Sequence, residues 1–205
     1  MYNILLAAGW PVWPLLITSI LALAILIERS WYLQKKRISP KHLITGAIQV
    51  ADSGALQNKV NLSNATQTLA AAAPMGQLLA CALTEKSKGN SRDTAMNKLA
   101  EVATEINFDL ERYLGALSTI ATLAPLLGLF GTVVGMIEIF GSSEGGATNP
   151  QQLAHGISIA LYNTAFGLLI AIPSYAGWKI LKATIARRQR ECEASLKQLL
   201  DHLYQ

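Results

Sequence analysis

Hydroxyl and amide side chains occur inside stretches of this chain that carry no charge. The two stretches concerned are residues 113–137 and 145–178. The polar residues at depth within them are Ser118, Thr119, Thr122, Thr132, Ser158, Tyr162, Asn163 and Thr164. Such groups can line a hydrated passage for ions, and they can equally form hydrogen bonds between neighbouring helices. A lone hydroxyl can also donate a hydrogen bond to a carbonyl oxygen of its own helix, whereas an Asn side chain is less easily satisfied within its own helix. The residue types alone leave the passage and the packing roles open.

The sequence offers no sign of catalytic chemistry. The polar segments contain no nucleophile motif, no metal-ligand spacing and no phosphate-binding loop, so we expect neither an enzyme nor a bound metal or cofactor. Cys81 and Cys192 match no zinc or redox motif. We expect both to remain reduced thiols without a disulfide, because the topology below places them in the cytoplasm.

The elements that must position these residues follow from the distribution of charge. Of the 205 residues, 51% are hydrophobic and only 15% are charged, against about 25% charged in soluble domains. Residues 1–27, 113–137 and 145–178 contain no charge, and each run is long enough for a helix to cross a bilayer. The runs lack the alternation of barrel strands. The sequence therefore predicts an all-α integral membrane protein with three transmembrane helices.

Basic residues predict the orientation of these helices. They follow the first run, as at Arg29 and Lys35, and the third run, as at Lys179 and Lys182, whereas residues 138–152 contain none. The positive-inside rule then places the N-terminus outside and the C-terminus in the cytoplasm. The net charge of +4 reflects this orientation, and no nucleic-acid partner is expected.

The predicted organisation has six segments. They are a first transmembrane helix at 1–28, a cytoplasmic helical module at 29–112, a second transmembrane helix at 113–140, a short outer loop at 141–152, a third transmembrane helix at 153–178 and a cytoplasmic C-terminal helix at 179–205.

Local signals divide the cytoplasmic module further. Residues 52–54 and 58–64 are expected to form turns or loose loop, and Pro74 suits the first turn of a helix that reaches Lys88. The Gly89-Asn90-Ser91 stretch is expected to end that helix and to cap the next one. From Ser91 we expect one unbroken helix that reaches Phe140 and extends the second span into the cytoplasm.

An apolar seam and an acidic stripe run along the cytoplasmic part of this helix. The seam comprises Met96, Leu99, Ala103, Ile106, Leu110, Tyr113 and Leu117. Glu101, Glu105 and Asp109 repeat every four residues, which gives an isolated helix no stability. The stripe is either a solvated face or a partner for the basic residues of the C-terminal helix, which are Arg187, Arg188 and Arg190. The second and third transmembrane helices are both expected to extend into the cytoplasm, where the two would pack antiparallel as a helical stalk.

Small residues and prolines of the second and third spans predict close helix packing. They are Pro125, Gly128, Gly131, Gly135, Gly167 and Pro173. In lipid, glycines at this spacing let helix backbones approach closely. Pro125 is expected to kink its helix.

Three runs of sequence carry a family resemblance. They are residues 123–135, with Gly-Leu-Phe-Gly-Thr at their centre, residues 155–168, with Tyr-Asn-Thr-Ala-Phe-Gly-Leu at their end, and Ile170-Ala-Ile-Pro173. Together they resemble the ExbB/TolQ/MotA proton-channel family, closest to ExbB and TolQ. The two signature spans cover roughly residues 115–180, and the three-span layout extends the resemblance to nearly the whole chain.

The resemblance implies a pentamer around an ExbD- or TolR-like dimer of single-span helices. A membrane Asp of that partner would bind and release protons, and the motifs carry over to Thr132 and Thr164 as the residues that face it. Thr122, Ser158 and Asn163 are further candidates for the pore lining. Members of the family commonly have a Glu where this chain has Ile159, so a relay through that carboxylate is not available. Glu138 and His155 are the nearest titratable residues.

The expected function is that of an ExbB-like subunit of a motor in the bacterial inner membrane. The proton-motive force would drive it, and it would energise TonB-dependent uptake across the outer membrane through a TonB-like protein. The alternatives are a TolQ-like subunit that maintains the envelope through a TolA-like protein, and a scaffold that does not conduct.

Overall fold

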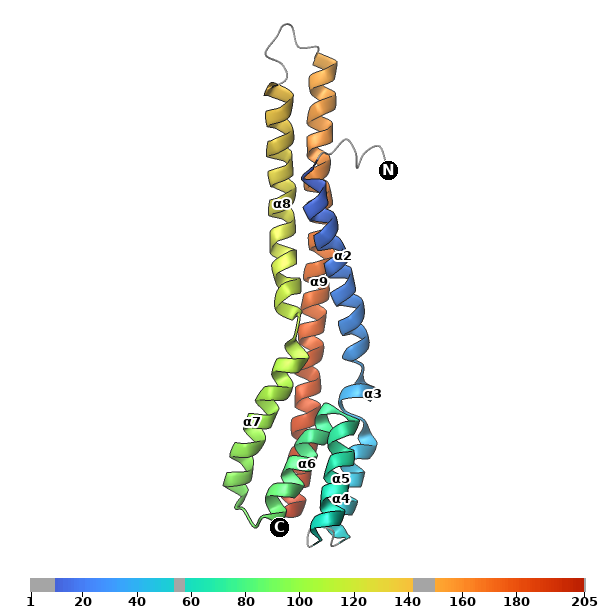
Figure 1. Ribbon diagram of the computed structural model, residues 1–205, viewed down its shortest axis with the longest axis vertical. Coiled ribbons are helices and arrows are strands. Elements are labelled where there is room, and N and C mark those ends of the chain that lie inside the picture. Colours follow the sequence, from blue (N-terminus) through green and yellow to red (C-terminus); the bar gives the residue numbers. More distant parts are fainter. Residues whose placement is uncertain (1–9, 54–57, 142–149, 205) are drawn as a thin grey trace. The chain divides into compact units, whose positions relative to one another are not determined.

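The chain is built from α-helices. The computed structural model describes residues 10–53, 58–141 and 150–204, and these ranges contain helices and turns without a strand (Figure 1). The helices are α2 (Val12–Tyr32), α3 (Lys35–Ile38), α4 (Lys41–Asp52), α5 (Lys59–Ala72), α6 (Pro74–Ser87), α7 (Arg92–Glu111), α8 (Leu114–Gly141) and α9 (Pro150–Leu203). Three helical stretches are long and apolar enough to cross a membrane. The predicted all-α membrane architecture is confirmed.

Two compact units divide the chain. The first contains the chain up to Arg29 together with Tyr113–Ile180, and the second contains Ser30–Arg112 together with Leu181–Gln205. Helix α9 contributes to both units without interruption.

The first unit packs α2, α8 and the first part of α9 through small residues. Gly177 of α9 meets the side chain of Leu26 on α2, and the ring of Phe130 on α8 lies 5.9 Å from that of Trp10, just before α2. Large apolar side chains point away from these contacts, among them Trp13, Ile20, Ile137, Leu169 and Ile172. Such an outer surface suits lipid and neighbouring membrane helices.

The second unit has an apolar core between α6, α7 and the end of α9. Leu79 and Leu83 of α6, Leu99 of α7 and Ile185 and Leu199 of α9 are all at most 2% exposed. Gly76 of α6 lies against the backbone carbonyl of Leu69 on α5, where a larger residue has no room.

Capping residues begin and end the helices of this unit. Pro74 occupies the first turn of α6, Gly89 has a positive φ of 78° after that helix, and the Ser91 side chain accepts a hydrogen bond from the Thr94 N–H at the start of α7. These boundaries confirm the sequence prediction. The loose loop predicted at residues 58–64 is wrong, because the Asn58 side chain accepts from the N–H groups of Val60 and Asn61 and begins α5.

The helix predicted to run unbroken from Ser91 to Phe140 is interrupted at Arg112 and Tyr113. Arg112 is extended, with a ψ of 136°, and Tyr113 has a φ of 64°, in the left-handed region that non-glycine residues rarely adopt. The Arg29 guanidinium lies 5.0 Å from the centroid of the Tyr113 ring, a cation–π contact that stabilises this turn. Helices α7 and α8 are therefore separate elements (Figure 1).

The apolar seam predicted along α7 is also displaced. Met96, Ala103 and Tyr113 are exposed, whereas the buried stripe consists of Ala95, Leu99, Ile106 and Leu110. At this level of α7 the buried residue is Ala95, which is 0% exposed, whereas Met96 is 51% exposed.

Candidate functional site

Two threonine hydroxyls form the polar centre of the α8–α9 contact. Thr132 Oγ1 of α8 and Thr164 Oγ1 of α9 lie 2.6 Å apart, and both residues are half-buried. Thr132 Oγ1 also lies 3.1 Å from the carbonyl oxygen of Gly128 and 3.2 Å from that of Ala160. One hydroxyl of α8 thus has three oxygen neighbours, two of them on α9.

The directions of these hydrogen bonds follow from the types of atoms. A carbonyl oxygen only accepts, and each hydroxyl has one hydrogen to donate. When Thr132 donates to the carbonyl of Gly128 or Ala160, Thr164 donates to Thr132, and Thr164 Oγ1 keeps a lone pair that faces away from the pair. When Thr132 donates to Thr164 instead, the Thr164 hydrogen is free to turn to another acceptor. The two arrangements differ only in hydroxyl rotation.

Glycines bring the two helices close enough for this contact. A Cβ built on Gly128 would lie 2.7 Å from the carbonyl oxygen of Asn163, and one on Gly167 would lie 2.5 Å from that of Ala124. A Cβ built on Gly135 would lie 3.1 Å from the Cβ of Ala160. Side chains larger than hydrogen at Gly128 and Gly167 would push the helices apart and lengthen the bond between the threonines.

Asn163 lies inside the same contact. Its side chain is 1% exposed and packs on Gly131, where an added Cβ would lie 2.9 Å from Asn163 Cβ. The structure therefore places the Asn163 side chain in the contact of α8 with α9 within one chain, next to Thr164 in sequence.

The other candidate residues for a pore lining lie on exposed surfaces. Thr122 donates to the carbonyl oxygen of Thr119 at 2.9 Å, and Ser158 donates to that of Ala154 at 2.9 Å. Both hydroxyls are satisfied within their own helices. Pro125 and Pro173 lie inside α8 and α9, where each removes one N–H donor from the helix.

A shallow apolar groove begins at Thr132. Its lining residues continue towards the end of α8 and are Thr132, Val133, Met136, Ile137, Phe140 and Gly141. Thr132, the α8 member of the threonine pair, lies at one end of this groove. Glu138 is exposed on the same helix, whereas the side chains of His155 and Ile159 lie outside the described residues.

Sequence reasoning missed two buried polar residues of the first unit. Arg29 is 3% exposed, pairs with Glu28 at 2.9 Å and covers the Tyr113 ring, and Ser174 is 1% exposed and donates to the carbonyl oxygen of Ile170. The charge of Arg29 at the end of an apolar run was visible in the sequence, but its aromatic partner lies 84 positions along the chain.

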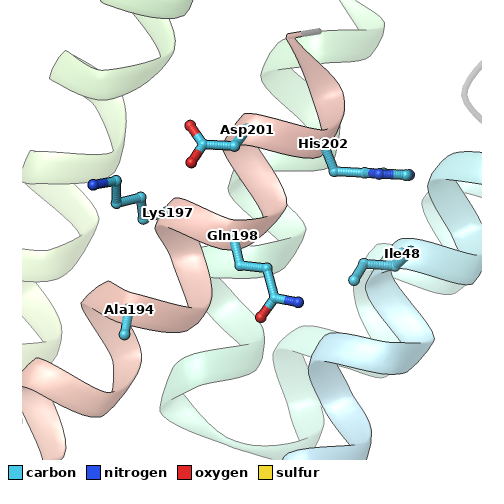
Figure 2. A pocket seen from close by; sticks show the side chains of 6 residues that line it. All are labelled: Ile48, Ala194, Lys197, Gln198, Asp201 and His202. Atoms are coloured by element: carbon cyan, nitrogen blue, oxygen red, sulfur yellow. The ribbon is translucent and has the colours of Figure 1, made fainter.

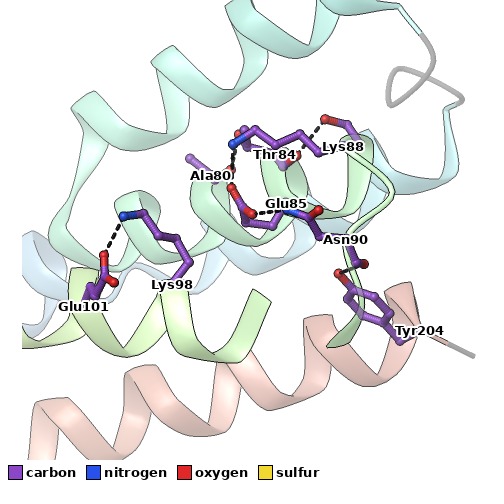
Figure 3. Close-up of polar contacts among 9 residues, drawn as sticks. Ala80, Thr84, Glu85, Lys88, Asn90, Lys98, Glu101 and Tyr204 are labelled. Atoms are coloured by element: carbon purple, nitrogen blue, oxygen red, sulfur yellow. Dashed lines mark hydrogen bonds and ion pairs between the residues drawn. The ribbon is translucent and has the colours of Figure 1, made fainter. Parts of the chain in front are cut away.

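In the second unit, a buried carboxylate organises the α6–α7 turn. Glu85 is 7% exposed and accepts from Lys88 Nζ at 2.7 Å and from Asn90 Nδ2 at 2.6 Å (Figure 3). These two hydrogen bonds lower the pKa of Glu85 below its ordinary value. The Tyr204 hydroxyl donates to the carbonyl oxygen of Asn90 at 3.2 Å, which fastens the end of α9 to the same turn.

Two titratable side chains in a hollow along α9 are paired with residues of neighbouring helices. It is lined by Ile48, Ala194, Lys197, Gln198, Asp201 and His202 (Figure 2). Asp201 pairs with Arg92 at 2.5 Å, and His202 lies 2.7 Å from Asp52. These pairs join α9 to α7 and to α4, so the paired side chains of the hollow serve the packing of these helices.

Glu101 of the acidic stripe and two of the basic residues of α9 form ion pairs within their own helices. Glu101 pairs with Lys98 at 2.5 Å, whereas Arg187 and Arg188 pair with Glu191 at 3.5 and 3.0 Å. Helices α7 and α9 do contact each other, through Asn107 and Gln189 and through Arg92 and Asp201, so their antiparallel packing is confirmed.

Comparisons with known proteins identify the family. Residues 68–194, which include α8 and most of α9, match the MotA/TolQ/ExbB proton channel family. The chain is 33% identical to the biopolymer transport protein exbB1 of Vibrio cholerae, over 92% of this chain and 82% of that protein. It is 29% identical to the ExbB of Pseudomonas putida, over 91% and 56%, and 28% identical to the ExbB of Salmonella typhimurium, over 83% and 71%. The chain belongs to the MotA/TolQ/ExbB proton channel family.

Proposed function

We propose that this chain is the ExbB-like subunit of an inner-membrane motor driven by the proton-motive force. In this proposal five copies surround an ExbD-like dimer, and the complex energises TonB-dependent uptake across the outer membrane. Family membership supports the proton-coupled activity, and the ExbB names of the relatives favour this task over the TolQ-like one. The basic residues after the first and third spans favour a periplasmic N-terminus and a cytoplasmic C-terminus.

The observation that carries the proposal is the bond between Thr132 and Thr164 at the rim of an apolar groove. An Asp on a single-span partner helix in this groove needs polar contacts in both of its protonation states. A protonated carboxyl donates a hydrogen bond, whereas a carboxylate only accepts.

The threonine pair can serve both states through hydroxyl rotation. When Thr132 donates to a carbonyl of Gly128 or Ala160, Thr164 Oγ1 accepts from the protonated Asp. When Thr132 donates to Thr164, the Thr164 hydroxyl donates to the carboxylate. The second arrangement partly offsets the desolvation that otherwise raises the pKa of a buried carboxyl.

The energy available fits this task. One proton that crosses a potential of 100 mV yields about 2.3 kcal/mol. A hydrogen bond to a charged group contributes about 1.5–3 kcal/mol, which is of the same order. The threonines can therefore adjust the protonation of the Asp without trapping it in either state.

The test is proton uptake by liposomes that contain the complex of this chain and its ExbD-like partner. We expect Thr132→Val to lower the uptake by about tenfold or more, because the Thr164 hydroxyl loses the partner whose rotation switches it between accepting and donating. Thr122→Val is the matched control, since Thr122 bonds within its own helix, and it should retain uptake within about twofold. Full uptake by an assembled Thr132→Val complex would contradict the role of the pair. A stable complex without uptake in the unmodified chain would indicate a scaffold.

A further inference from the structure

We infer that the acidic face of α7 in one copy of this chain docks on the basic face of α9 in the neighbouring copy. The acidic face comprises Glu101, Glu105, Phe108 and Asp109, and the basic face comprises Ala183, Ala186, Arg187, Arg190, Ala194 and Lys197. This inference rests on the ring of copies proposed above, and it names the cytoplasmic contact that sets the register of that ring.

The acidic face of α7 points away from the core of its own unit. Its four residues are exposed, on the side opposite the buried stripe of Ala95, Leu99, Ile106 and Leu110. Phe108 is 78% exposed, more than any other large hydrophobic side chain in the described ranges. An exposed aromatic ring beside carboxylates, outside the membrane-spanning unit, is typical of a contact surface.

The basic face of α9 has the complementary character. All six of its residues are exposed, and three of them are alanines that permit another helix to approach closely. The Arg187 side chain is 75% exposed and makes only a 3.5 Å pair with Glu191. Neither the Glu105 side chain nor the Arg190 side chain has a hydrogen bond or ion pair to any residue in the described part of the chain.

Contacts within one chain fix which residues share a level. Asn107 of α7 contacts Gln189 of α9, and near the far end of the pair Arg92 contacts Asp201. Counting along the antiparallel helices at 1.5 Å per residue then places Glu105 level with residues 188–191 of α9. Arg190 lies within that range.

Rotation about an axis parallel to α7 and α9 keeps each residue at its level along these helices. In a ring of this kind, Glu105 of one copy therefore meets Arg190 of the next, where their opposite charges attract. By the same count, Phe108 meets residues 185–188 of the next copy, where the exposed Ala186 leaves space for its ring. The Glu105–Arg190 pair and the contact of Phe108 with Ala186 are therefore compatible with the same register of α7 in one copy against α9 in the next.

This contact uses a different patch on each partner, so it repeats around a ring. Interfaces of this type close when the rotation between neighbours divides a full turn. Opposite charges at such a surface contribute modest affinity and mainly select orientation and register.

A cysteine pair tests the register directly. In the full complex with the ExbD-like partner, with Cys81 and Cys192 replaced by Ala, we expect Glu105→Cys with Arg190→Cys to give a ladder of covalent multimers on oxidation. The control combines Glu105→Cys with Lys197→Cys, because Lys197 lies on the same face about 10 Å further along α9. The control should yield at least fivefold less cross-linked product. Equal yields from both pairs, or no ladder from the first, would overturn the inference.

Charge exchange provides a second test. Glu105→Arg and Arg190→Glu should each lower the fraction of intact ring in detergent several-fold, and the double variant should restore it, because the attraction returns with its signs exchanged. Phe108→Ala should also lower it, whereas Val60→Ala, which removes another highly exposed apolar side chain, should not. Failure of the double variant to recover would count against the pairing.

The stoichiometry of the complex separates this inference from the proposed function. Native mass measurement of the unmodified complex shows whether copies of the chain form a ring around the partner. A ring without the 105–190 cross-link overturns the α7–α9 contact and leaves the proposed function standing. A chain that forms no ring with the partner overturns the proposed function itself.

Discussion

Thr132 Oγ1 of α8 and Thr164 Oγ1 of α9 lie 2.6 Å apart, so the two family motifs meet in one hydrogen bond. Each residue was picked out from its own segment of sequence, and the structure joins them within one chain. The neighbouring carbonyls of Gly128 and Ala160 give the pair two ways to arrange its hydrogens.

Two substitutions of Thr164 separate the effect of its hydroxyl group from the effect of its side-chain shape. Thr164→Ser keeps the oxygen and should retain proton uptake within about threefold, whereas Thr164→Val should lower it by about tenfold or more. The measurement is proton uptake by liposomes at a fixed membrane potential, with the subunit ratio checked beforehand. Equal loss in both variants would show that packing of the methyl group, not hydrogen bonding, governs the effect.

The close α8–α9 contact predicts a position-dependent effect of adding one methyl group. Gly167→Ala and Gly128→Ala place a Cβ against the backbone carbonyls of Ala124 and Asn163, and we expect each to destabilise the fold by about 1–3 kcal/mol. Gly115→Ala is the control, since it has no neighbour within 4 Å and gains helix propensity. Unfolding of the chain in mixed micelles with increasing SDS measures the difference. Equal stability of the three variants would contradict the packing described.

Glu85 predicts how the stability of the second unit depends on pH. Hydrogen bonds from Lys88 and Asn90 lower the pKa of the folded state below the ordinary value of 4.5. The unfolded chain therefore takes up the proton first as the pH falls. The stabilisation is present in full above about pH 4.5 and is lost as the pH falls through the lowered folded value.

Glu85→Gln should consequently lower the thermal unfolding midpoint at pH 7, with a smaller difference from the unmodified chain at pH 3. Glu101→Gln is the control, because its carboxylate is 68% exposed and pairs with Lys98 at the surface, where ion pairs contribute little. A difference for Glu85→Gln that stays constant from pH 7 to pH 3 would show that its charge does not stabilise the turn.

The positive φ of Tyr113 predicts that a glycine substitution at this position is less destabilising than an alanine substitution. Both Tyr113→Gly and Tyr113→Ala remove the contact with Arg29, but only glycine adopts a φ of 64° without a steric penalty. We expect the Gly variant to be more stable than the Ala variant by about 1 kcal/mol. Inside a continuous helix the order would be the reverse, so a more stable Ala variant in chemical unfolding would disprove the break.

Hydropathy and charge predicted the three spans and the helical class because a bilayer imposes a length and a composition on what crosses it. The caps at Pro74 and Ser91 were predictable for a similar reason, since they depend only on local backbone geometry. The start of α5 was missed because its Asn-rich sequence is typical of turns, although one of these residues, Asn58, serves as the cap.

The break between α7 and α8 was not predictable from the pattern of apolar residues. Leu110 and Leu117 are both buried and lie two helical turns apart in sequence, as in a continuous helix. What sets the break is the backbone at Tyr113 and its contact with Arg29, which lies far away in sequence. The hydrogen bond between Thr132 and Thr164 likewise depends on the register of α8 against α9. The glycines allow the two helices to approach closely, but they do not determine this register.

The break also sets how mechanical load can travel along the chain. Helix α9 runs for 54 residues, about 80 Å, and its helical backbone continues through Pro173, where one hydrogen bond is missing. Between α7 and α8 the helical backbone is interrupted at Arg112 and Tyr113, so bending compliance is concentrated at two residues. A rotation of α9 about its own axis at Thr164 is therefore transmitted along one continuous helix. A change in the tilt of α8 is transmitted to α7 only through the non-helical residues Arg112 and Tyr113.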